Sequence, residues 1–477
     1  MKRLASTLVV LLAIASAWAQ AITPQAAADR FANDSIMKHA AFSVMFMDID
    51  SGEEIASVNP ELSVTTASTM KTVVSLAALE TLGGAFKFET PVYMWGKVKK
   101  DKFKGDIIVV GSGDPTLGSK YFKDLASLPG EIVAALKARG INKVEGNIVI
   151  DNSLYPTPYY SDYWEIGDLA QYYGAGVFPL NYRDNLIGFS YNVTPEGRID
   201  SARFSPEIPG VGFIDRSRPG KTNERFTMVE YGSNSLALHG ELACNEVSAT
   251  YNWHVANPCP DAYLRYDIEQ ALKEAGFKLK IKNIKEKDKE MRELLTTHYS
   301  PVLTDIVTSL LHRSDNMFAH SMLRAIAVRS AKYQNEGGDF DLTGVAEVVD
   351  ILKRLGVDTK PLRMYDGSGL ARADHGSAHM FCQMLRAIAN KRYNGVRMTD
   401  LMSRAGKRVG HMLGETSLAN DVSLKSGSMT DVQTFVGYYP AENPKICWAI
   451  LANNWDGTRS QLRDNMDRLL IGVLLGE

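Results

Sequence analysis

The sequence predicts a mixed α/β (α+β) protein in which two end segments form one domain and a β-rich region is inserted between them. A hairpin pattern and a buried helix pattern come first, and three strand patterns and a helix pattern come last. Between them, short β-like runs alternate with glycine and proline turns, which is typical of β-rich structure. We therefore expect one domain from residues 20–84 and 293–477, and an inserted region at 85–292 with a nested small domain at 192–243.

The first segment contains a hairpin followed by a helix that is buried on all sides. Residues 42–48 are rich in apolar side chains, residues 50–52 supply a turn, and residues 54–58 return as the second strand. A helix over 70–82 follows the Thr/Ser-rich residues 65–68 and is stopped by two glycines. Because apolar residues cover nearly every face of this helix, we expect it in the core.

The remaining elements are short strands and helices in the inserted region, and helices and strands after it. In the inserted region we expect strands at 105–111 and 146–151 and helices at 131–138 and 261–275. After it we expect a helix at 301–312, a break at 314–316, a second helix, strands at 422–425, 432–439 and 446–452, and a helix at 459–475.

Composition and the N-terminal residues indicate an exported globular protein. Of the 477 residues 45 % are apolar and 23 % charged, and the formal charge of −2 offers no basic excess for nucleic-acid binding. Residues 1–19 have a basic start, an apolar stretch and an Ala-Trp-Ala ending, which is typical of a secretory signal peptide. The apolar stretch is too short for a membrane span; an uncleaved N-terminal anchor is the alternative. We expect a periplasmic or extracellular protein without a stable membrane anchor.

Four cysteines are too few for a disulfide framework in a chain of this length. Cys244 and Cys259 bracket a polar segment and could pair in an oxidising compartment. Cys382 and Cys447 lie in apolar helix and strand patterns, which are typical of buried thiols.

Two patterns that resemble metal and phosphate sites lack essential residues. His375 and His379 beside Asp374 have no glutamate of a His-Glu-x-x-His site and no evident third ligand. The glycine pair in 111–114 lacks the lysine of a phosphate-binding loop. We therefore expect no metal and no cofactor.

Nucleophilic chemistry is suggested by Ser68-Thr69-Met70-Lys71. On a helix, residues three apart share a face, so the lysine amine can take the proton of the serine hydroxyl. Burial together with a nearby cation would lower the pKa of that lysine, as such a base requires. The tetrapeptide is a weak signal alone, since Ser68 could be a plain N-cap and a second copy occurs at Ser35-Ile36-Met37-Lys38.

Two later motifs strengthen the case because of their order and setting. Ser314-Asp315-Asn316 lies between two helix patterns, and Lys425-Ser426-Gly427 ends a strand pattern near the C-terminus. Ser-x-x-Lys, Ser-x-Asn and Lys-[Ser/Thr]-Gly in this order are the motif set of penicillin-binding proteins. A Gly-x-Ser-x-Gly elbow, as in a generic serine esterase, is absent around Ser68.

On these motifs the chain resembles the serine penicillin-recognising enzymes. It is most similar to the class C low-molecular-mass penicillin-binding proteins, the D-alanyl-D-alanine carboxypeptidase/endopeptidases, over essentially the whole mature chain. Segments 111–117, 172–175, 184–185 and 366–370 match further family segments. The resemblance implies a penicillin-binding transpeptidase/β-lactamase-like domain: an antiparallel sheet with helices on both faces, a helical subdomain, and inserted domains between the first two motifs.

The resemblance also implies a role for each motif residue. Ser68 would be the nucleophile, Lys71 its general base, Ser314 a proton relay and Asn316 a holder of the substrate amide. Lys425 would add positive charge and Ser426 would bind the substrate carboxylate, while Gly427-Ser428 would complete an oxyanion hole from the N–H groups of Ser68 and Ser428. The third motif has serine where the family usually has threonine, which keeps the hydroxyl.

The implied substrates are peptidoglycan stem peptides that end in D-Ala-D-Ala or are cross-linked through D-Ala, with β-lactams as acylating inhibitors. In relatives a subsite holds the diaminopimelate side chain, and Asp151 and Arg372 fall where its aspartate and arginine are found. Thr430 stands where a glutamine is common. The alternative is a non-catalytic member that binds peptidoglycan or a partner.

Overall fold

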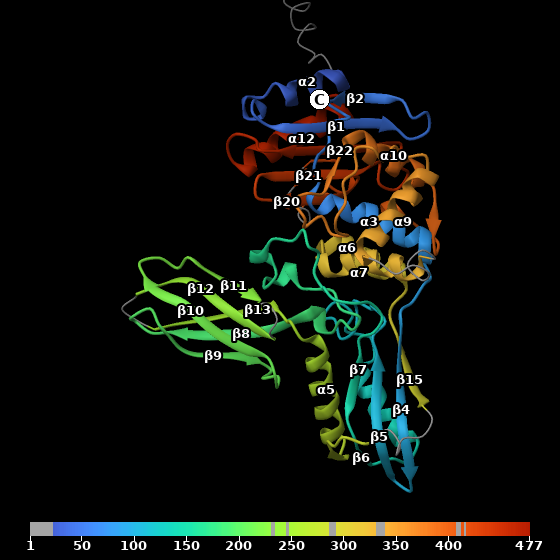
Figure 1. Cartoon of the computed structure of the whole chain (residues 1–477). Helices are drawn as coiled ribbons and strands as arrows, with labels where there is room; N and C mark the ends of the chain where they lie inside the picture. Colours follow the sequence, from blue (N-terminus) through green and yellow to red (C-terminus); the bar gives the residue numbers. More distant parts are fainter. Residues whose placement is uncertain are drawn as a thin grey trace, which may run out of the picture.

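The computed structural model describes residues 22–229, 234–244, 248–285, 292–330, 339–406, 412–414 and 416–477. The chain folds into three parts. The first is a domain built from both ends of the chain, the second is an elongated inserted region that lies below it in Figure 1, and the third is a β-rich unit that projects to one side. The predicted signal peptide, residues 1–19, lies outside the described residues. None of the helices in the described part combines the length and apolar character needed to cross a membrane.

The first domain is built on a six-stranded antiparallel sheet in the order β19-β20-β21-β22-β1-β2. N-terminal and C-terminal segments meet in it, because β1 pairs with β22 along its whole length. The strands are β1 (Ala41–Asp48), β2 (Glu54–Val58), β19 (Ser403–Arg404), β20 (Ser423–Met429), β21 (Val432–Tyr439) and β22 (Ile446–Asn453). The predicted hairpin and the three C-terminal strands are therefore confirmed.

Helices cover both faces of this sheet (Figure 1). On one face, α2 (Pro24–Ala32) and α12 (Arg459–Leu475) bury Phe31, Met466 and Leu470 against strand residues such as Trp448. The apolar residues near the C-terminus, such as Leu469, Leu470 and Val473, thus pack in the core. On the other face lie α10 (Ala378–Ile388) and α3 (Met70–Leu82).

A helical layer surrounds α3. It consists of α6 (Leu303–Arg313), α7 (Asn316–Arg329) and α9 (Phe340–Arg354), all of which contact α3. Residues 70–79 of α3 are buried without exception. This confirms the expectation of a helix enclosed on all sides, and it explains why the helix has no polar face.

The inserted region has its own sheet, in the order β14-β6-β5-β4-β15, with β7 beside β5. Its helices α4 (Leu128–Ala138) and α5 (Pro260–Glu274) contribute Ile132, Leu136 and Leu272 to a separate apolar core. The strands are β4 (Glu89–Lys99), β5 (Lys102–Val110), β6 (Lys143–Glu145), β7 (Ile148–Asp151), β14 (Lys278–Lys280) and β15 (Arg292–Tyr299).

The nested unit consists of two three-stranded sheets, β13-β8-β9 and β10-β12-β11. It runs from Leu186 to Ala256 and is therefore longer at both ends than the predicted 192–243. Its strands are β8 (Leu186–Val193), β9 (Ile199–Ser205), β10 (Gly212–Gly220), β11 (Arg225–Val229), β12 (Ser235–Ala243) and β13 (Ala249–Ala256).

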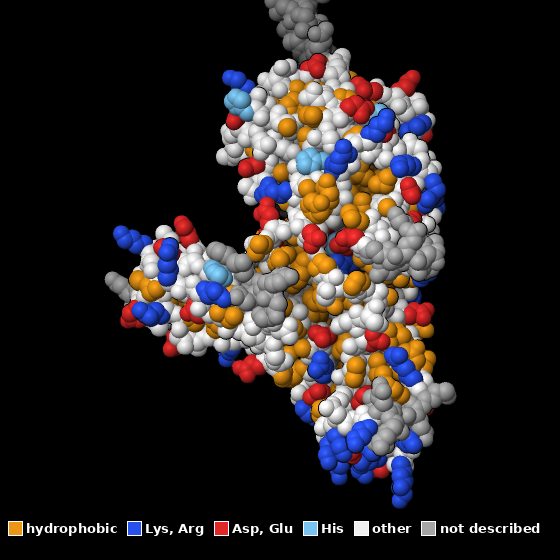
Figure 2. All heavy atoms as spheres, in the orientation of Figure 1, with side chains coloured by type: hydrophobic (Ala, Val, Ile, Leu, Met, Phe, Trp, Pro, Cys, Tyr) orange, Lys and Arg blue, Asp and Glu red, His pale blue; other side chains and the backbone are white. Residues whose placement is uncertain are grey.

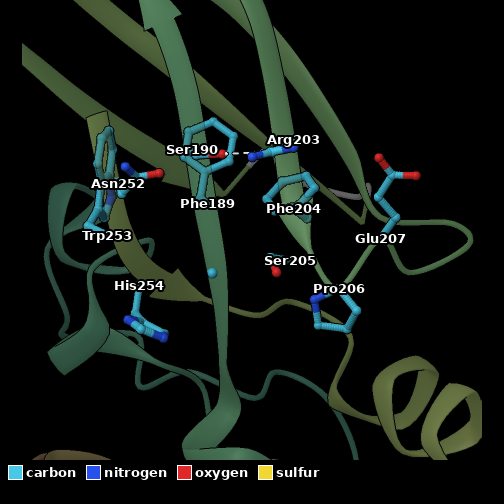
Figure 3. A pocket seen from close by; sticks show the side chains of 11 residues that line it. Phe189, Ser190, Arg203, Phe204, Ser205, Pro206, Glu207, Asn252, Trp253 and His254 are labelled. Atoms are coloured by element: carbon cyan, nitrogen blue, oxygen red, sulfur yellow. Dashed lines mark hydrogen bonds between the residues drawn. The ribbon is translucent and has the colours of Figure 1, made fainter. Parts of the chain in front are cut away.

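The first of these sheets carries a hollow of about 700 Å³, shown in Figure 3. Arg203 donates to the Ser190 hydroxyl at 3.3 Å on its floor, with Asn252 and His254 on the neighbouring strand. No residue of the three sequence motifs lines this hollow.

All four cysteines are free thiols. Cys244 is exposed and donates to the Glu196 carbonyl, whereas Cys259 is buried, so the two are not paired with each other. Cys382 on α10 and Cys447 on β22 are buried, as their apolar patterns indicated, and each thiol donates to the backbone carbonyl of the other residue.

Candidate active site

The three motifs meet at a hollow of about 410 Å³ between the sheet and the helical layer. Ser68, Ser314, Asn316 and Ser428 line it, and Arg372 stands at its side. Ser68 lies on a 3₁₀ turn, Ala67–Thr69, that leads into α3. Ser314 ends α6, Asn316 begins α7, and residues 425–428 lie on β20. Elements from both ends of the chain therefore build one site.

Lys71 is the central group of the site. Its Nζ lies 2.9 Å from Ser68 Oγ, 2.5 Å from Asn316 Oδ1 and 2.6 Å from the Ser368 carbonyl oxygen. The residue is completely buried. A neutral amine can donate to the amide and carbonyl oxygens and present its lone pair to the serine hydroxyl. The arrangement can therefore remove the hydroxyl proton of Ser68.

Burial lowers the pKa of Lys71 from 10.5 to about 8. The charges of Asp366, Asp315 and Asp374 act in the opposite direction and keep the pKa from falling further. Of the two causes predicted from the sequence, burial and a nearby cation, burial is the one that lowers this pKa. A lysine with a pKa of about 8 is neutral in a useful fraction of molecules near neutral pH.

Lys425 lies in a second buried position of the same site. Its Nζ donates to Ser314 Oγ at 2.9 Å and to the Ser426 carbonyl. Burial, and after it the charge of Lys71, lowers the pKa of Lys425 well below its ordinary value. A neutral Lys425 is therefore favoured as long as Lys71 is charged.

The backbone around Ser68 is held in uncommon conformations. Ala67 has a φ of 45° and Ser314 a φ of 58°, in the left-handed region that residues with a side chain seldom adopt. Gly427 approaches so closely that a Cβ there would lie 2.9 Å from the Ser68 nitrogen and 2.8 Å from the Thr66 carbonyl oxygen. The glycine of Lys-Ser-Gly is therefore required for β20 to reach the nucleophile.

A loop that the sequence marked only by its family resemblance, residues 366–371, supports Lys71. The buried Asp366 carboxylate accepts hydrogen bonds from the N–H groups of Ser368 at 2.7 Å and Gly369 at 2.6 Å. It also accepts one from the Trp164 indole. Asp366 thus fixes the loop whose Ser368 carbonyl binds Lys71. The signal that could have located it is Asp-Gly-Ser-Gly, a tight turn.

Two buried carboxyl groups, of Asp366 in this loop and of Asp374 just after it, have pKa values shifted in opposite directions. Burial and the Asp366 charge raise the pKa of Asp374 well above its usual value. Burial opposes ionisation of Asp366 too, but the charge of His320 and hydrogen bonds from Asp374 and Trp164 outweigh it and lower its pKa. The surroundings therefore favour a neutral Asp374 next to an ionised Asp366.

The structure brings Arg372 to the hollow but not Asp151. Arg372 forms an ion pair with Glu165 at 2.7 Å and lines the hollow together with Asp168 and Tyr173. Asp151 lies at the end of β7 in the inserted sheet, with its carboxylate 3.9 Å from Arg292. The acidic side chains near Arg372 are thus Glu165 and Asp168, which the sequence analysis missed because their segment has only short 3₁₀ turns.

The second Ser-x-x-Lys and the histidine cluster have structural roles. Ser35 lies on an isolated 3₁₀ turn after α2, apart from the other motifs. His375 belongs to a short strand pair and contacts the Ala373 carbonyl. Across the described ranges, no group of three or more His, Cys, Asp or Glu side chains is arranged to hold a metal ion.

The fold is that of a penicillin-binding protein. A crystal structure of penicillin-binding protein 4 (dacB) from Haemophilus influenzae superposes with a TM-score of 0.73, at 23 % identity, over 91 % of this chain and 95 % of that one. A second structure of that protein, in complex with a β-lactam, gives a TM-score of 0.69 at 21 % identity, over 93 % and 97 % of the two chains.

Sequence comparison identifies the family. The model of the D-Ala-D-Ala carboxypeptidase 3 (S13) family matches residues 25–472, so the chain belongs to that family and is a D-Ala-D-Ala carboxypeptidase, a peptide hydrolase. D-alanyl-D-alanine carboxypeptidase DacB of Haemophilus influenzae is 26 % identical over 422 residues, which are 86 % of this chain and 84 % of the relative. A D-alanyl-D-alanine carboxypeptidase of Actinomadura is 25 % identical over 449 residues, 90 % and 80 % of the two chains.

Proposed function

We propose that the chain is an exported serine DD-peptidase that cleaves peptidoglycan stem peptides, or cross-links through D-Ala, by way of an acyl-enzyme on Ser68. The observation that supports this proposal is the 2.9 Å distance between Lys71 Nζ and Ser68 Oγ. The other two hydrogen bonds of the amine, to Asn316 Oδ1 and the Ser368 carbonyl, hold it in that position. Penicillin acylates the same serine.

In the acylation step, Ser68 Oγ bonds to the carbonyl carbon of the penultimate D-Ala and gives its proton to Lys71. The C–N bond to the terminal residue then breaks, and the leaving amine takes a proton through Ser314, which Lys425 contacts at 2.9 Å. Water hydrolyses the ester with Lys71 again as the base. The N–H groups of Ser68 and Ser428 stabilise the oxyanion, and the close approach of Gly427 to the Ser68 nitrogen supports this pairing.

Asn316 and residues 425–428 orient the peptide. Asn316 donates to the Tyr173 carbonyl at 2.8 Å while its oxygen accepts from Lys71, so its amide is held in one orientation. The substrate amide binds beside it, and the terminal carboxylate binds to Ser426, next to the Lys425 amino group. An endopeptidase substrate differs only in the group attached to the leaving amine, so the site serves both reactions.

We further propose that Arg372, with Glu165 and Asp168, binds a stem-peptide side chain that ends in an amino and a carboxyl group, such as diaminopimelate. A guanidinium next to two carboxylates complements both ends of such a group. Because Glu165 and Arg372 pair at 2.7 Å when the site is free, the ligand would replace this ion pair with two of its own.

Covalent labelling tests the nucleophile. A fluorescent penicillin should give one adduct per wild-type chain, mapped by mass spectrometry to Ser68, and none on Ser68→Ala. Ser35→Ala is the matched control and should be labelled as wild type. A folded wild-type protein without an adduct would favour the non-catalytic, peptidoglycan-binding alternative, and an adduct on Ser35 would contradict the assignment of the motifs.

Paired substrates test the side-chain subsite. Arg372→Ala should lower kcat/KM for a diaminopimelate peptide by about tenfold or more, because a charged hydrogen bond is lost, and change turnover of a simple acyl-D-Ala-D-Ala little. Asp151→Ala serves as the control and should affect neither substrate. Equal losses on both substrates in Arg372→Ala would show that the arginine serves the reaction centre instead.

A further inference from the structure

One face of the inserted sheet is an array of lysines in register. Across the four strands β4, β5, β6 and β14, one row of directly opposed residues is Lys99, Lys102, Lys143 and Lys278. The next row is Lys97, Lys104, Glu145 and Lys280. Since opposed residues, and residues two apart on a strand, share a face, all eight side chains point the same way. We call these seven lysines the lysine face.

The lysine face is open to solvent, whereas the opposite face of the sheet is covered. Phe103 and Val144, which alternate with the lysines, are buried in the core formed with α4 and α5. Lys97, Lys99, Lys104, Lys278 and Lys280 are exposed. Figure 2 shows Lys and Arg side chains gathered at this end of the molecule, at the opposite end from the catalytic domain of Figure 1.

Folding stability does not explain this array. Like charges placed directly opposite each other destabilise a sheet. Three carboxylates offset part of the charge: Glu145 pairs with Lys102 and, at 3.5 Å, with Lys282, Asp101 pairs with Lys143 at 2.8 Å, and the buried Asp106 lies on the same face directly opposite Trp95. Among the described residues of this face, lysines still outnumber carboxylates, on a chain whose overall formal charge is −2.

The same sheet face continues from lysines to aromatic and apolar residues. On β4, Tyr93 and Trp95 share a face with Lys97 and Lys99 by alternation, and both are half-buried. Leu294 on β15 is directly opposite Tyr93 and is 48 % exposed. Cations next to Trp, Tyr and Leu on one surface are the composition of sites that lie on a lipid interface.

We propose that the lysine face, with Tyr93, Trp95 and Leu294, docks the protein on an anionic phospholipid bilayer. The array spans four neighbouring strands, and it uses lysine, a hydrated point charge, instead of arginine, which suits bidentate recognition of individual groups. Docking through this end leaves the catalytic hollow free to bind its substrate, because the hollow lies where the inserted region meets the first domain, away from the tip of the inserted sheet in Figure 1.

Vesicle binding tests the proposal. The purified chain should co-sediment with phosphatidylglycerol/phosphatidylcholine vesicles, not with phosphatidylcholine alone, and binding should fall as salt rises. The variant Lys99→Gln/Lys104→Gln/Lys278→Gln/Lys280→Gln should bind about 100-fold or more weaker, since each lysine near an anionic surface contributes about fivefold. The control Lys38→Gln/Lys123→Gln/Lys221→Gln/Lys360→Gln removes the same charge from other exposed positions and should bind as wild type.

Penicillin labelling of every variant at the wild-type level shows that each one is folded. Three results would overturn the proposal: no binding to the anionic vesicles at low salt, an equal loss of binding in the two quadruple variants, or full competition by inorganic polyphosphate at an equal phosphate concentration. The last result would identify a soluble polyanion as the occupant. A loss of binding specific to the lysine-face variant, with Trp95→Ala weakening it further, would support the bilayer.

Discussion

At the scale of single residues, the site is organised around the three oxygen atoms that contact the Lys71 amine. Asn316 Oδ1 and the Ser368 carbonyl cannot donate to nitrogen, so they accept from it in either charge state. In the neutral state the remaining position holds the lone pair, which then faces Ser68 Oγ. Two fixed acceptors therefore determine which direction the base points.

The first prediction concerns pH. Burial moves the pKa of Lys71 down to about 8, so the neutral base becomes available at a lower pH than for an ordinary lysine. The rate of acylation by a soluble β-lactam should rise with pH and level off above about 8, as stopped-flow kinetics would show. Lys71→Arg, which stays protonated, should abolish acylation, and Lys38→Arg should leave it unchanged. A flat pH profile in the wild type would contradict Lys71 as the base.

The second prediction concerns Asp366. Asp366→Asn replaces one acceptor oxygen by an amide that cannot accept from the loop N–H groups, so the Ser368 carbonyl should shift and acylation should slow by about 10- to 100-fold. Asp374→Asn keeps a neutral donor beside Asp366 and should change the rate little. Equal rates for the two variants would show that Asp366 does not position the base. Circular dichroism would confirm that both variants fold.

At the scale of elements, Ser68 is placed by a junction of three segments. The turn that precedes α3 is enclosed by β20 at Gly427 and by the 366–371 loop at Gly369. A Cβ on Gly369, which has a φ of 74°, would lie 1.9 Å from the Ala67 carbonyl oxygen. Both glycines are therefore contacts that hold the strained Ala67 in place beside the nucleophile.

This junction gives the third prediction. Gly369→Ala should displace the turn and slow penicillin labelling by about 100-fold, the usual effect of misplacing a catalytic group by 1 Å. Gly356→Ala has a similar φ of 79° but no atom within 4 Å of the added Cβ, so it should lower the free energy of unfolding by about 1–2 kcal/mol and leave labelling intact. Labelling of Gly369→Ala at the wild-type rate would show that the contact does not position Ser68.

The regular elements were predictable from sequence where hydrophobic patterning is strong. The hairpin at 41–58, the helix at 70–82 and the three C-terminal strands match within a few residues. The structure of the irregular segment at 152–185 was not predictable, because its short 3₁₀ turns have no hydrophobic periodicity. The sequence therefore did not show that Asp168 of this segment lines the same hollow as Arg372, whereas Asp151, at the end of β7, does not line it.

At the scale of the whole molecule, one buried arginine connects the inserted region to the helical layer. Arg324 on α7 donates to the Val177 carbonyl at 2.8 Å, to the Pro158 carbonyl at 3.0 Å and to Asp341 at 3.0 Å. Trp164, from the same inserted segment, donates to Asp366 beneath the active site. The inserted region is therefore part of the structure that supports catalysis.

The fourth prediction follows from this connection. Arg324→Met should lower the free energy of unfolding by about 3–5 kcal/mol, because Asp341 loses one of its two buried partners, keeping only His320, and two carbonyls lose their donor. Burial alone would raise the pKa of Asp341, but His320 and Arg324 hold it well below its usual range, so this stability is present above about pH 4 and is lost as pH falls further. Urea unfolding measures it. Arg329→Met on the same helix should change stability little.

The pairing of β1 with β22 places a limit on when the enzyme can form. Ala41 pairs with Asn453, so the hairpin that contributes β1 is made first and waits for a partner strand roughly 400 residues later. At the ordinary speed of a ribosome this interval is about 20–80 s. During that time only the β1–β2 hairpin of the six-stranded sheet has been synthesised, and Lys425 and Ser426 are not yet part of the chain. The sheet and the active site can therefore form only when synthesis of the chain is nearly complete, and the protein is inactive until then.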